Sequence, residues 1–210
     1  MRKLAVFSLS AVLRYEYATF QRFAQMSIEK VEGEPFSLAP ADGEKNIQQL
    51  LLETYRLHKQ EQPSAAKLKK IEKQFSKYLK KYFVQEEDSF EVRPGVQNIF
   101  NHIEKRKNWK YCILSPYWNK ATHQVLESCG VYSKNKFTIT ANQALTAQEQ
   151  LEIAMARTKK KNKGLKVFLV NENLNIELNE PFELIQPKGS KSAPNYFIYP
   201  KFSELFKAHL

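Results

Sequence analysis

The sequence has few of the residues on which small disulfide-rich or metal-binding domains are built. Its 210 residues include two cysteines and no C-x-x-C pair, which excludes a disulfide framework and a cysteine-rich zinc site. Four histidines stand far apart, and none of them belongs to an H-x-x-x-H or H-E-x-x-H array. We therefore expect no metal site of these types, unreactive thiols and a reducing, cytoplasmic compartment.

Long apolar segments are lacking too. A basic start at residues 1–3 is followed by an apolar run at 4–13, as at the beginning of a signal peptide. No small-x-small cleavage site comes after the run, which is also too short to span a bilayer. We interpret the run as a buried first strand and expect no membrane insertion.

Acidic residues are too few to balance the basic ones. The chain has 33 lysines and arginines against 22 aspartates and glutamates, a net charge of +11. This balance favours an anionic ligand, an acidic protein partner or nucleic acid, although a solvated lysine surface is the simpler explanation. The segment 64–83 concentrates the charge, with seven lysines against one glutamate. The basic surface expected there consists of Lys67, Lys70, Lys73, Lys77, Lys80 and Lys81.

Apolar spacing predicts an α/β fold, and a hydrophobic fraction of 42% is enough for a core. Residues 4–9 are typical of a strand that is covered on both faces, as in a parallel sheet. The segment 14–88 is predicted to be all helix. Its three apolar stripes are Phe20, Phe23, Ala24 and Ile28, then Ile47, Leu50, Leu51 and Tyr55, then Leu68, Ile71, Phe75, Leu79 and Tyr82, with Ser64 as the cap of the third.

From residue 90 onward the pattern alternates between helices and short apolar strands. Strands are expected at 111–114, 137–139, 167–170, 182–185 and 196–198, with helices before, between and after them, the last at 202–209. This alternation indicates right-handed crossovers. We therefore expect a Rossmann-like parallel sheet with helices on both faces, plus a small all-helical cap inserted after the first strand. The core then comprises 1–13 and 89–210, and the cap comprises 14–88.

Polar residues follow several of the predicted strands, where an open parallel sheet binds its ligands. Ser8 and Ser10 end the first strand, Ser115 ends the second, and Asn171 and Glu172 follow the strand at 167–170. Glu172 is the one carboxylate of this group. Serine and asparagine are also ordinary turn residues, so each of them taken alone has a structural explanation.

The layout resembles the haloacid dehalogenase-like superfamily, most members of which are phosphohydrolases. The first family motif is an apolar strand ending in Asp-x-Asp, and Val6–Leu13 matches its phase with serines in place of both aspartates. Ser115 matches the second motif, a strand ending in Ser or Thr, and Val92–Val96 looks like the return from cap to core. The third motif supplies a Lys near Thr146, where this chain has none. The fourth, a strand followed by acidic residues, corresponds to Val167–Asn175.

The resemblance implies a catalytic centre that has lost its chemistry. In the family the first Asp attacks phosphorus, the second acts as acid and base, and the fourth motif helps to hold Mg²⁺. Serine and asparagine are poor Mg²⁺ ligands, so we expect no cofactor and no metal. The degenerate active-site positions are Ser8, Ser10, Ser115, Asn171, Glu172 and Asn175.

Three residues after the second strand are candidates for ligand contacts. Tyr117, Trp118 and Asn119 lie at the mouth of the predicted site, where the two aromatic rings would stack on a ligand. The alternative is an aromatic cluster between cap and core. The sequence thus favours a non-enzymatic binding or regulatory protein, with a weak phosphohydrolase of small phosphorylated substrates or a basic anion- or nucleic-acid-binding module as alternatives.

Overall fold

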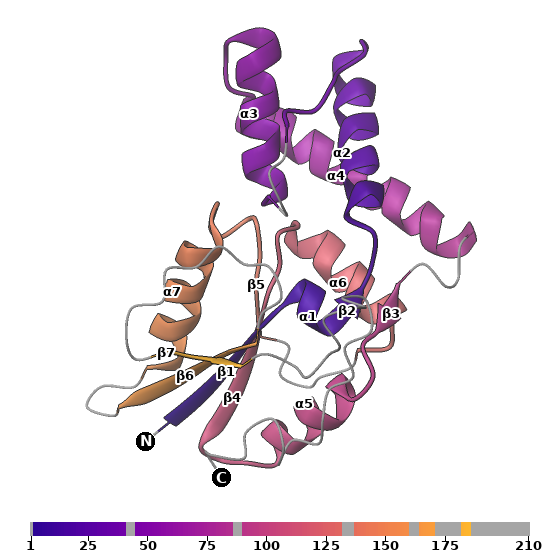
Figure 1. Cartoon of the computed structure of the whole chain (residues 1–210). Helices are drawn as coiled ribbons and strands as arrows, with labels where there is room; N and C mark the ends of the chain where they lie inside the picture. Colours follow the sequence, from indigo (N-terminus) through magenta and orange to yellow (C-terminus); the bar gives the residue numbers. More distant parts are fainter. Residues whose placement is uncertain are drawn as a thin grey trace.

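The chain folds into an α/β core with three helices above one end of its sheet (Figure 1). The predicted fold class is thereby confirmed. Two predicted elements, the strand at 196–198 and the closing helix at 202–209, lie outside the described residues. The computed structural model describes residues 2–40, 45–85, 90–131, 137–159, 164–170 and 182–185.

The first strand is the centre of the sheet. Strand β1 (Arg2–Ser8) pairs in parallel with β4 (Trp109–Leu114) on one side and with β6 (Leu165–Val170) on the other. Short outer strands β5 (Thr138–Ile139) and β7 (Phe182–Ile185) complete the described sheet in the order β5-β4-β1-β6-β7. All carboxyl ends therefore lie at the same edge, and the end of β1 lies in the middle of that edge.

Helices cover both faces of the sheet because β1 is apolar on both. Ala5 and Phe7 pack on the side of α5 (Val96–Glu104) and α6 (Asn119–Ser128). Leu4 and Val6 pack on the side of α7 (Ala147–Thr158). Thr146 begins α7 with a capping box, in which its side chain and that of Glu149 each accept a backbone N–H of the other.

The helical insertion, here called the cap, consists of α2 (Tyr17–Glu32), α3 (Ile47–Lys59) and α4 (Ala65–Gln85). Residues with capping preferences set several of the ends of these helices. Gly33 ends α2 at a φ of 78°, the side chain of Asn46 caps α3, and the hydroxyl of Ser64 accepts the N–H of Lys67 in α4. None of the helices in the described part of the chain has the length and apolarity that a bilayer crossing requires.

Two expectations about secondary structure near the beginning of the cap were wrong. Leu9 does not continue the first strand but begins the one-turn helix α1 (Leu9–Val12), because the Ser8 side chain caps that turn. Residue 14 is not helical either. It belongs to β2 (Leu13–Arg14), which pairs antiparallel with β3 (Glu91–Val92) and forms a two-stranded connection between core and cap.

An aromatic seam joins the cap to the core. Phe20 of α2 stacks on Tyr117, which follows β4, with ring centroids 3.8 Å apart and planes 13° apart. Phe75 of α4 meets Trp118 edge to face at 5.4 Å. One continuous hydrophobic cluster runs from the cap helices through these rings to the α5 side of the sheet. The division into a core of 1–13 and 89–210 and a cap of 14–88 stays a prediction.

A half-buried carboxylate ties the three cap helices together. Glu32 of α2 accepts a hydrogen bond of 2.6 Å from the Tyr55 hydroxyl of α3. It also forms an ion pair with Lys67 of α4, at an N–O distance of 2.9 Å. Burial alone would raise the pKa of Glu32, but the hydrogen bonds from Tyr55 and Lys67 outweigh it, and the pKa lies below its usual value.

Truncating the seam should destabilise the whole molecule. Phe20→Ala removes a ring with no exposed surface, and we expect a loss of about 3–5 kcal/mol in the free energy of unfolding. Leu57→Ala is the control, because that side chain is 64% exposed and its loss should change stability by less than about 0.5 kcal/mol. Urea denaturation followed by circular dichroism measures both. A loss in Phe20→Ala no larger than in the control would contradict the continuous cluster.

The Glu32 interactions should make stability depend on pH. Because the folded pKa is lowered, the stabilisation is complete above the ordinary value of 4.5 and is lost as pH falls through the folded pKa. We expect Glu32→Gln to lower stability by about 2 kcal/mol at neutral pH and by much less in acid. Glu34→Gln, which removes the exposed ion pair with Lys59, should change it by less than about 1 kcal/mol. A Glu32→Gln effect that is equal at both pH values would show that the carboxylate charge is irrelevant.

Candidate functional site

Ser8 occupies the end of the central strand, and its hydroxyl serves the local fold. The Ser8 Oγ accepts the N–H of Ala11 at 3.1 Å and thereby caps α1. It also hydrogen-bonds the hydroxyl of Ser10 at 3.0 Å. The side chain is 1% exposed. The hydroxyl is therefore buried and held by two partners, neither of which accepts a proton as a base would.

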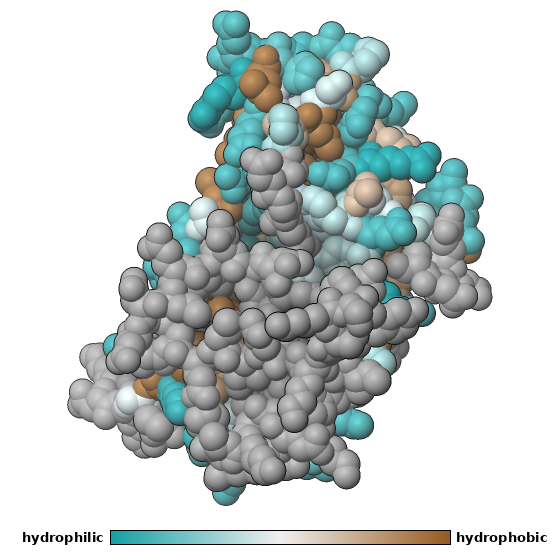
Figure 2. Space-filling model, viewed as in Figure 1, coloured by the Kyte–Doolittle hydropathy of each residue, from teal (hydrophilic) through white to brown (hydrophobic). Residues whose placement is uncertain are grey.

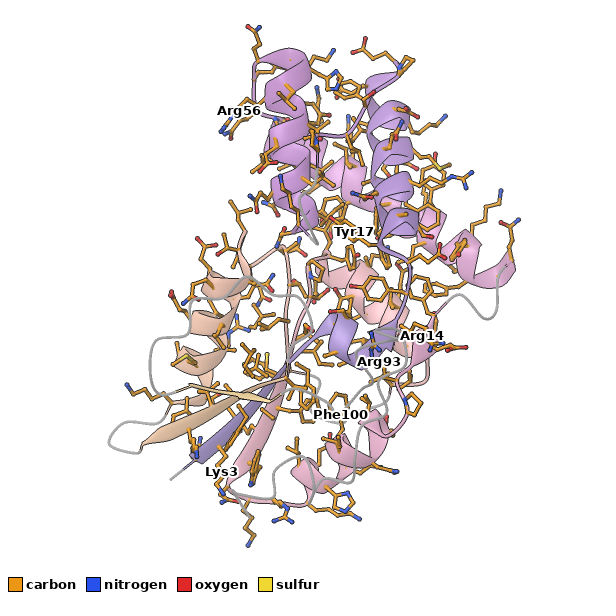
Figure 3. All side chains as sticks on the ribbon, viewed as in Figure 1. Lys3, Arg14, Tyr17, Arg56, Arg93 and Phe100 are labelled. Atoms are coloured by element: carbon orange, nitrogen blue, oxygen red, sulfur yellow. The ribbon has the colours of Figure 1, made fainter. Side chains whose placement is uncertain are left out.

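Arg93 is the charged residue that sequence reasoning did not identify as part of this site. Its Nε donates to the Ser10 carbonyl at 2.6 Å, and its backbone N–H donates to the Val12 carbonyl at 2.9 Å. Arg93 is 7% exposed and follows β3, so it fastens the chain returning from the cap onto α1 (Figure 3). The sequence contained a hint, because Arg93 falls within the stretch that resembles the family's return from cap to core.

Ser115 lies at the end of β4, beside β1, and is fully buried. Its hydroxyl hydrogen-bonds Thr122 Oγ1 at 2.7 Å and accepts the N–H of Tyr117 at 3.2 Å. Its carbonyl accepts the Gln150 side-chain amide at 3.0 Å. Ser115 thus links the end of β4 to α6 and α7. This serine therefore has a structural role at the edge of the sheet where the site was predicted.

Two of the three residues expected to contact a ligand are buried aromatic residues. Tyr117 is 0% and Trp118 2% exposed, because Phe20 and Phe75 of the cap pack against their rings. Of the two interpretations that the sequence left open, the aromatic cluster between cap and core describes these side chains. Asn119 is exposed, and its backbone N–H donates to the Asn142 side chain at 2.6 Å.

The cap closes over the carboxyl ends of two strands through polar contacts. The backbone N–H of Ile47 donates to the Pro116 carbonyl at 2.7 Å, just beyond β4. The side-chain amide of Asn46 donates to the Ala144 carbonyl at 2.9 Å, in the turn between β5 and α7. The beginning of α3 therefore rests directly on the loops that follow β4 and β5.

The remaining predicted site residues follow strand β6. Strand β6 ends at Val170, which pairs with Phe7, one residue before Ser8. Asn171, Glu172 and Asn175 come after that strand and lie outside the described residues.

The described side chains do not fit Mg²⁺. The residues at the described motif positions are Ser8, Ser10 and Ser115, which offer neutral hydroxyls where Mg²⁺ requires charged oxygen ligands. The Ser8 and Ser115 hydroxyls are also engaged in hydrogen bonds within the protein. In the part of the chain that the structure describes, no three His, Cys, Asp or Glu residues come together as a metal site would require.

The cysteines do not offer a reactive thiol. Cys112 of β4 is fully buried, and burial raises its pKa far above the ordinary value. Burial also raises the pKa of Cys129, at the end of α6, to about 11. Since the thiolate is the reactive form, neither side chain is a nucleophile near neutral pH.

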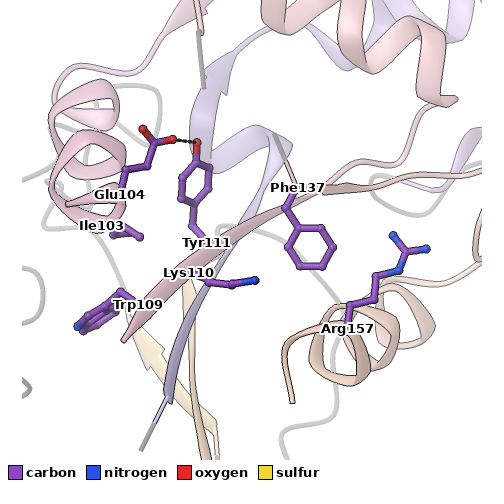
Figure 4. A pocket seen from close by; sticks show the side chains of 7 residues that line it. All are labelled: Ile103, Glu104, Trp109, Lys110, Tyr111, Phe137 and Arg157. Carbon is purple, nitrogen blue, oxygen red and sulfur yellow. Dashed lines mark hydrogen bonds between the residues drawn. The ribbon is translucent and has the colours of Figure 1, made fainter. Parts of the chain in front are cut away.

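A cavity of about 300 Å³ lies at the opposite end of the sheet from Ser8, beside the first half of β4 (Figure 4). It is separate from the predicted site. Glu104 accepts a hydrogen bond of 3.1 Å from the Tyr111 hydroxyl at its wall. The lining residues are Ile103, Glu104, Trp109, Lys110, Tyr111, Phe137 and Arg157.

Solved structures are similar to this chain. No family model and no curated protein matches the chain. A hydrolase from Pseudomonas syringae is similar with a TM-score of 0.53 at 12% identity, over 80% of this chain and 75% of that one. CbbY from Rhodobacter sphaeroides, solved in complex with phosphate, has a TM-score of 0.53 at 8% identity, over 80% and 77%. The chain therefore shares its α/β fold with these two proteins.

Proposed function

We propose that this chain is a haloacid dehalogenase-like protein that binds a ligand or regulates a partner without hydrolysing phosphate esters. The observation that carries this proposal is that Ser8 is buried and its hydroxyl is engaged in the local fold. At the end of the central strand, where the family resemblance implies the attacking aspartate, a buried serine hydroxyl caps a turn of helix. We also propose a reducing, cytoplasmic setting, in keeping with the free thiols of Cys112 and Cys129.

The chemistry at Ser8 argues against a serine nucleophile. A serine hydroxyl attacks phosphorus or carbon efficiently when a neighbouring base removes its proton. The partners of Ser8 are the Ser10 hydroxyl and the Ala11 N–H, and neither is basic. Ser10 also has no pKa suited to proton transfer in the range where a protein works. Nucleophile and acid–base group are thus both missing from the first motif.

Access to Ser8 is a second argument. A phosphate ester must bring its phosphorus within about 3–3.5 Å of the attacking atom, so the attacking atom has to be reachable. Ser8 is 1% exposed, and the aromatic seam together with the contacts of Asn46 and Ile47 holds the cap against the loops beside it. At that exposure the Ser8 hydroxyl is out of reach of a phosphate ester.

The alternative is a weak phosphohydrolase that acts on a small phosphorylated substrate. It is favoured by the names of the structural neighbours, a hydrolase and a protein solved with phosphate. The buried guanidinium of Arg93, which donates to the Ser10 carbonyl, would add positive charge to such a site. An anionic ligand held there without turnover is compatible with the first proposal.

The two alternatives differ in the effect of removing the Ser8 hydroxyl. We expect wild type, Ser8→Ala and the matched control Ser10→Ala to hydrolyse an aryl phosphate no faster than buffer, with or without Mg²⁺. We also expect Ser8→Ala to lose about 1 kcal/mol of stability, since it removes a helix cap, and Ser10→Ala to lose less. Turnover by wild type that disappears in Ser8→Ala and persists in Ser10→Ala would establish Ser8 as a working nucleophile and overturn the proposal.

A further inference from the structure

The outer surface of α4 carries a dense array of lysines. Within α4 (Ala65–Gln85), Ile71, Phe75 and Leu79 are fully buried in the cap. The remaining surface of the helix is rich in exposed positive charge, and we name it the lysine face. Its members are Lys69, Lys70, Lys73, Lys77, Lys80 and Lys81, all of them exposed.

The lysine face is a single stripe. At about 100° per residue, the six lysines fall within an arc of about 120° around the helix axis. The centre of the buried stripe formed by Ile71, Phe75 and Leu79 lies about 180° away. At a rise of about 1.5 Å per residue, Lys70 to Lys80 extends over about 15 Å. The end of α4 projects beyond α2 (Figure 1), and the face of the cap seen in Figure 2 is mostly hydrophilic.

The charges of the lysine face are not neutralised by the described neighbours. Lys67, which is not part of the face, pairs with Glu32. Among the ion pairs of the described residues, none includes a member of the lysine face. Glu72, the one acidic residue of α4, lies outside the arc, and its carboxylate accepts the side-chain amide of Asn142 at 3.5 Å. The lysines are therefore available to external anions.

We propose that the lysine face binds the phosphate backbone of nucleic acid without reading its sequence. Nucleic acid presents about one charge per 1.7 Å of duplex axis, so a row of flexible ammonium groups over about 15 Å meets several phosphates at once. Lysine contacts phosphate as a mobile point charge, which favours affinity over base recognition. The net charge of +11 adds long-range attraction to the same partner.

Two other partners fit the surface less well. Protein interfaces are depleted of lysine and centre on aromatic or aliphatic anchors. Of the large apolar side chains in the described residues, Leu57 and Val84 are exposed, and of these Val84 belongs to α4, one residue from its end. A helix that lies in a membrane surface inserts its apolar face, and the apolar face of α4 is already buried in the cap.

Binding to this face is independent of the Ser8 site. The lysine face shares no residue with that site, so a failure of nucleic-acid binding would leave the phosphatase experiment unaffected, and the reverse also holds. The test is fluorescence anisotropy of a labelled short DNA duplex with the intact protein, repeated over about 50–200 mM salt.

The decisive variant replaces Lys70, Lys73, Lys77 and Lys80 with glutamine. Glutamine has nearly the same helix propensity as lysine, so α4 should stay folded, which an unchanged urea midpoint would verify. The matched control replaces four exposed lysines of the core with glutamine and so changes the net charge by the same amount. These lysines are Lys105, Lys107, Lys110 and Lys159. It separates binding by the lysine face from attraction by total charge.

We expect wild type to bind the duplex with an affinity that falls steeply with salt. The lysine-face variant should bind at least about tenfold more weakly at low salt, with a salt slope smaller by about 3–4 units. The control should keep nearly the wild-type slope. Absence of binding by wild type, or equal losses in both variants, would overturn the proposal. Tighter binding of a labelled polyglutamate peptide or of phosphatidylserine vesicles than of the duplex would also overturn it and identify the other class of partner.

Discussion

The stacking of Phe20 on Tyr117 is the contact on which the arrangement of this molecule depends. It joins the first cap helix to the loop after β4, with ring centroids 3.8 Å apart, and it continues through Phe75 and Trp118. Aromatic pairs of this kind bury large apolar areas and have preferred geometries, so they hold two bodies in one orientation. Through them the cap and the α5 side of the sheet share one hydrophobic cluster.

The end of the first strand contributes to the contact between core and cap. Here the central strand ends in Ser8, which is buried, and its hydroxyl caps a helical turn. Arg93 then fastens that turn to the chain returning from the cap. The residues at the end of β1 stabilise the junction between core and cap, which is a structural use of a position associated with catalysis in the family it resembles.

Helix α4 shows how one helix serves two purposes. Its apolar stripe, with Ile71, Phe75 and Leu79 at its centre, supplies the cap core and part of the seam. The opposite side carries the lysine face, and Lys67 at its border turns inward to Glu32 instead. Glu32 also accepts the Tyr55 hydroxyl, so this carboxylate links the three cap helices and does not pair with a member of the lysine face.

Periodic patterns were sufficient to predict the longer elements and the fold class. The stripes of α2, α3 and α4 repeat over enough residues to identify these segments as helices. The sequence also indicated that Ser8 and Ser115 lie at the same edge of the sheet, because parallel strands end at one edge. Elements as short as α1, β2 and β3 do not show a period. A local side-chain cap decides α1, and pairing between residues distant in the chain decides β2 and β3. Only the tertiary structure could bury Tyr117 and bring Arg93 to Ser10, since those contacts join residues distant in the chain.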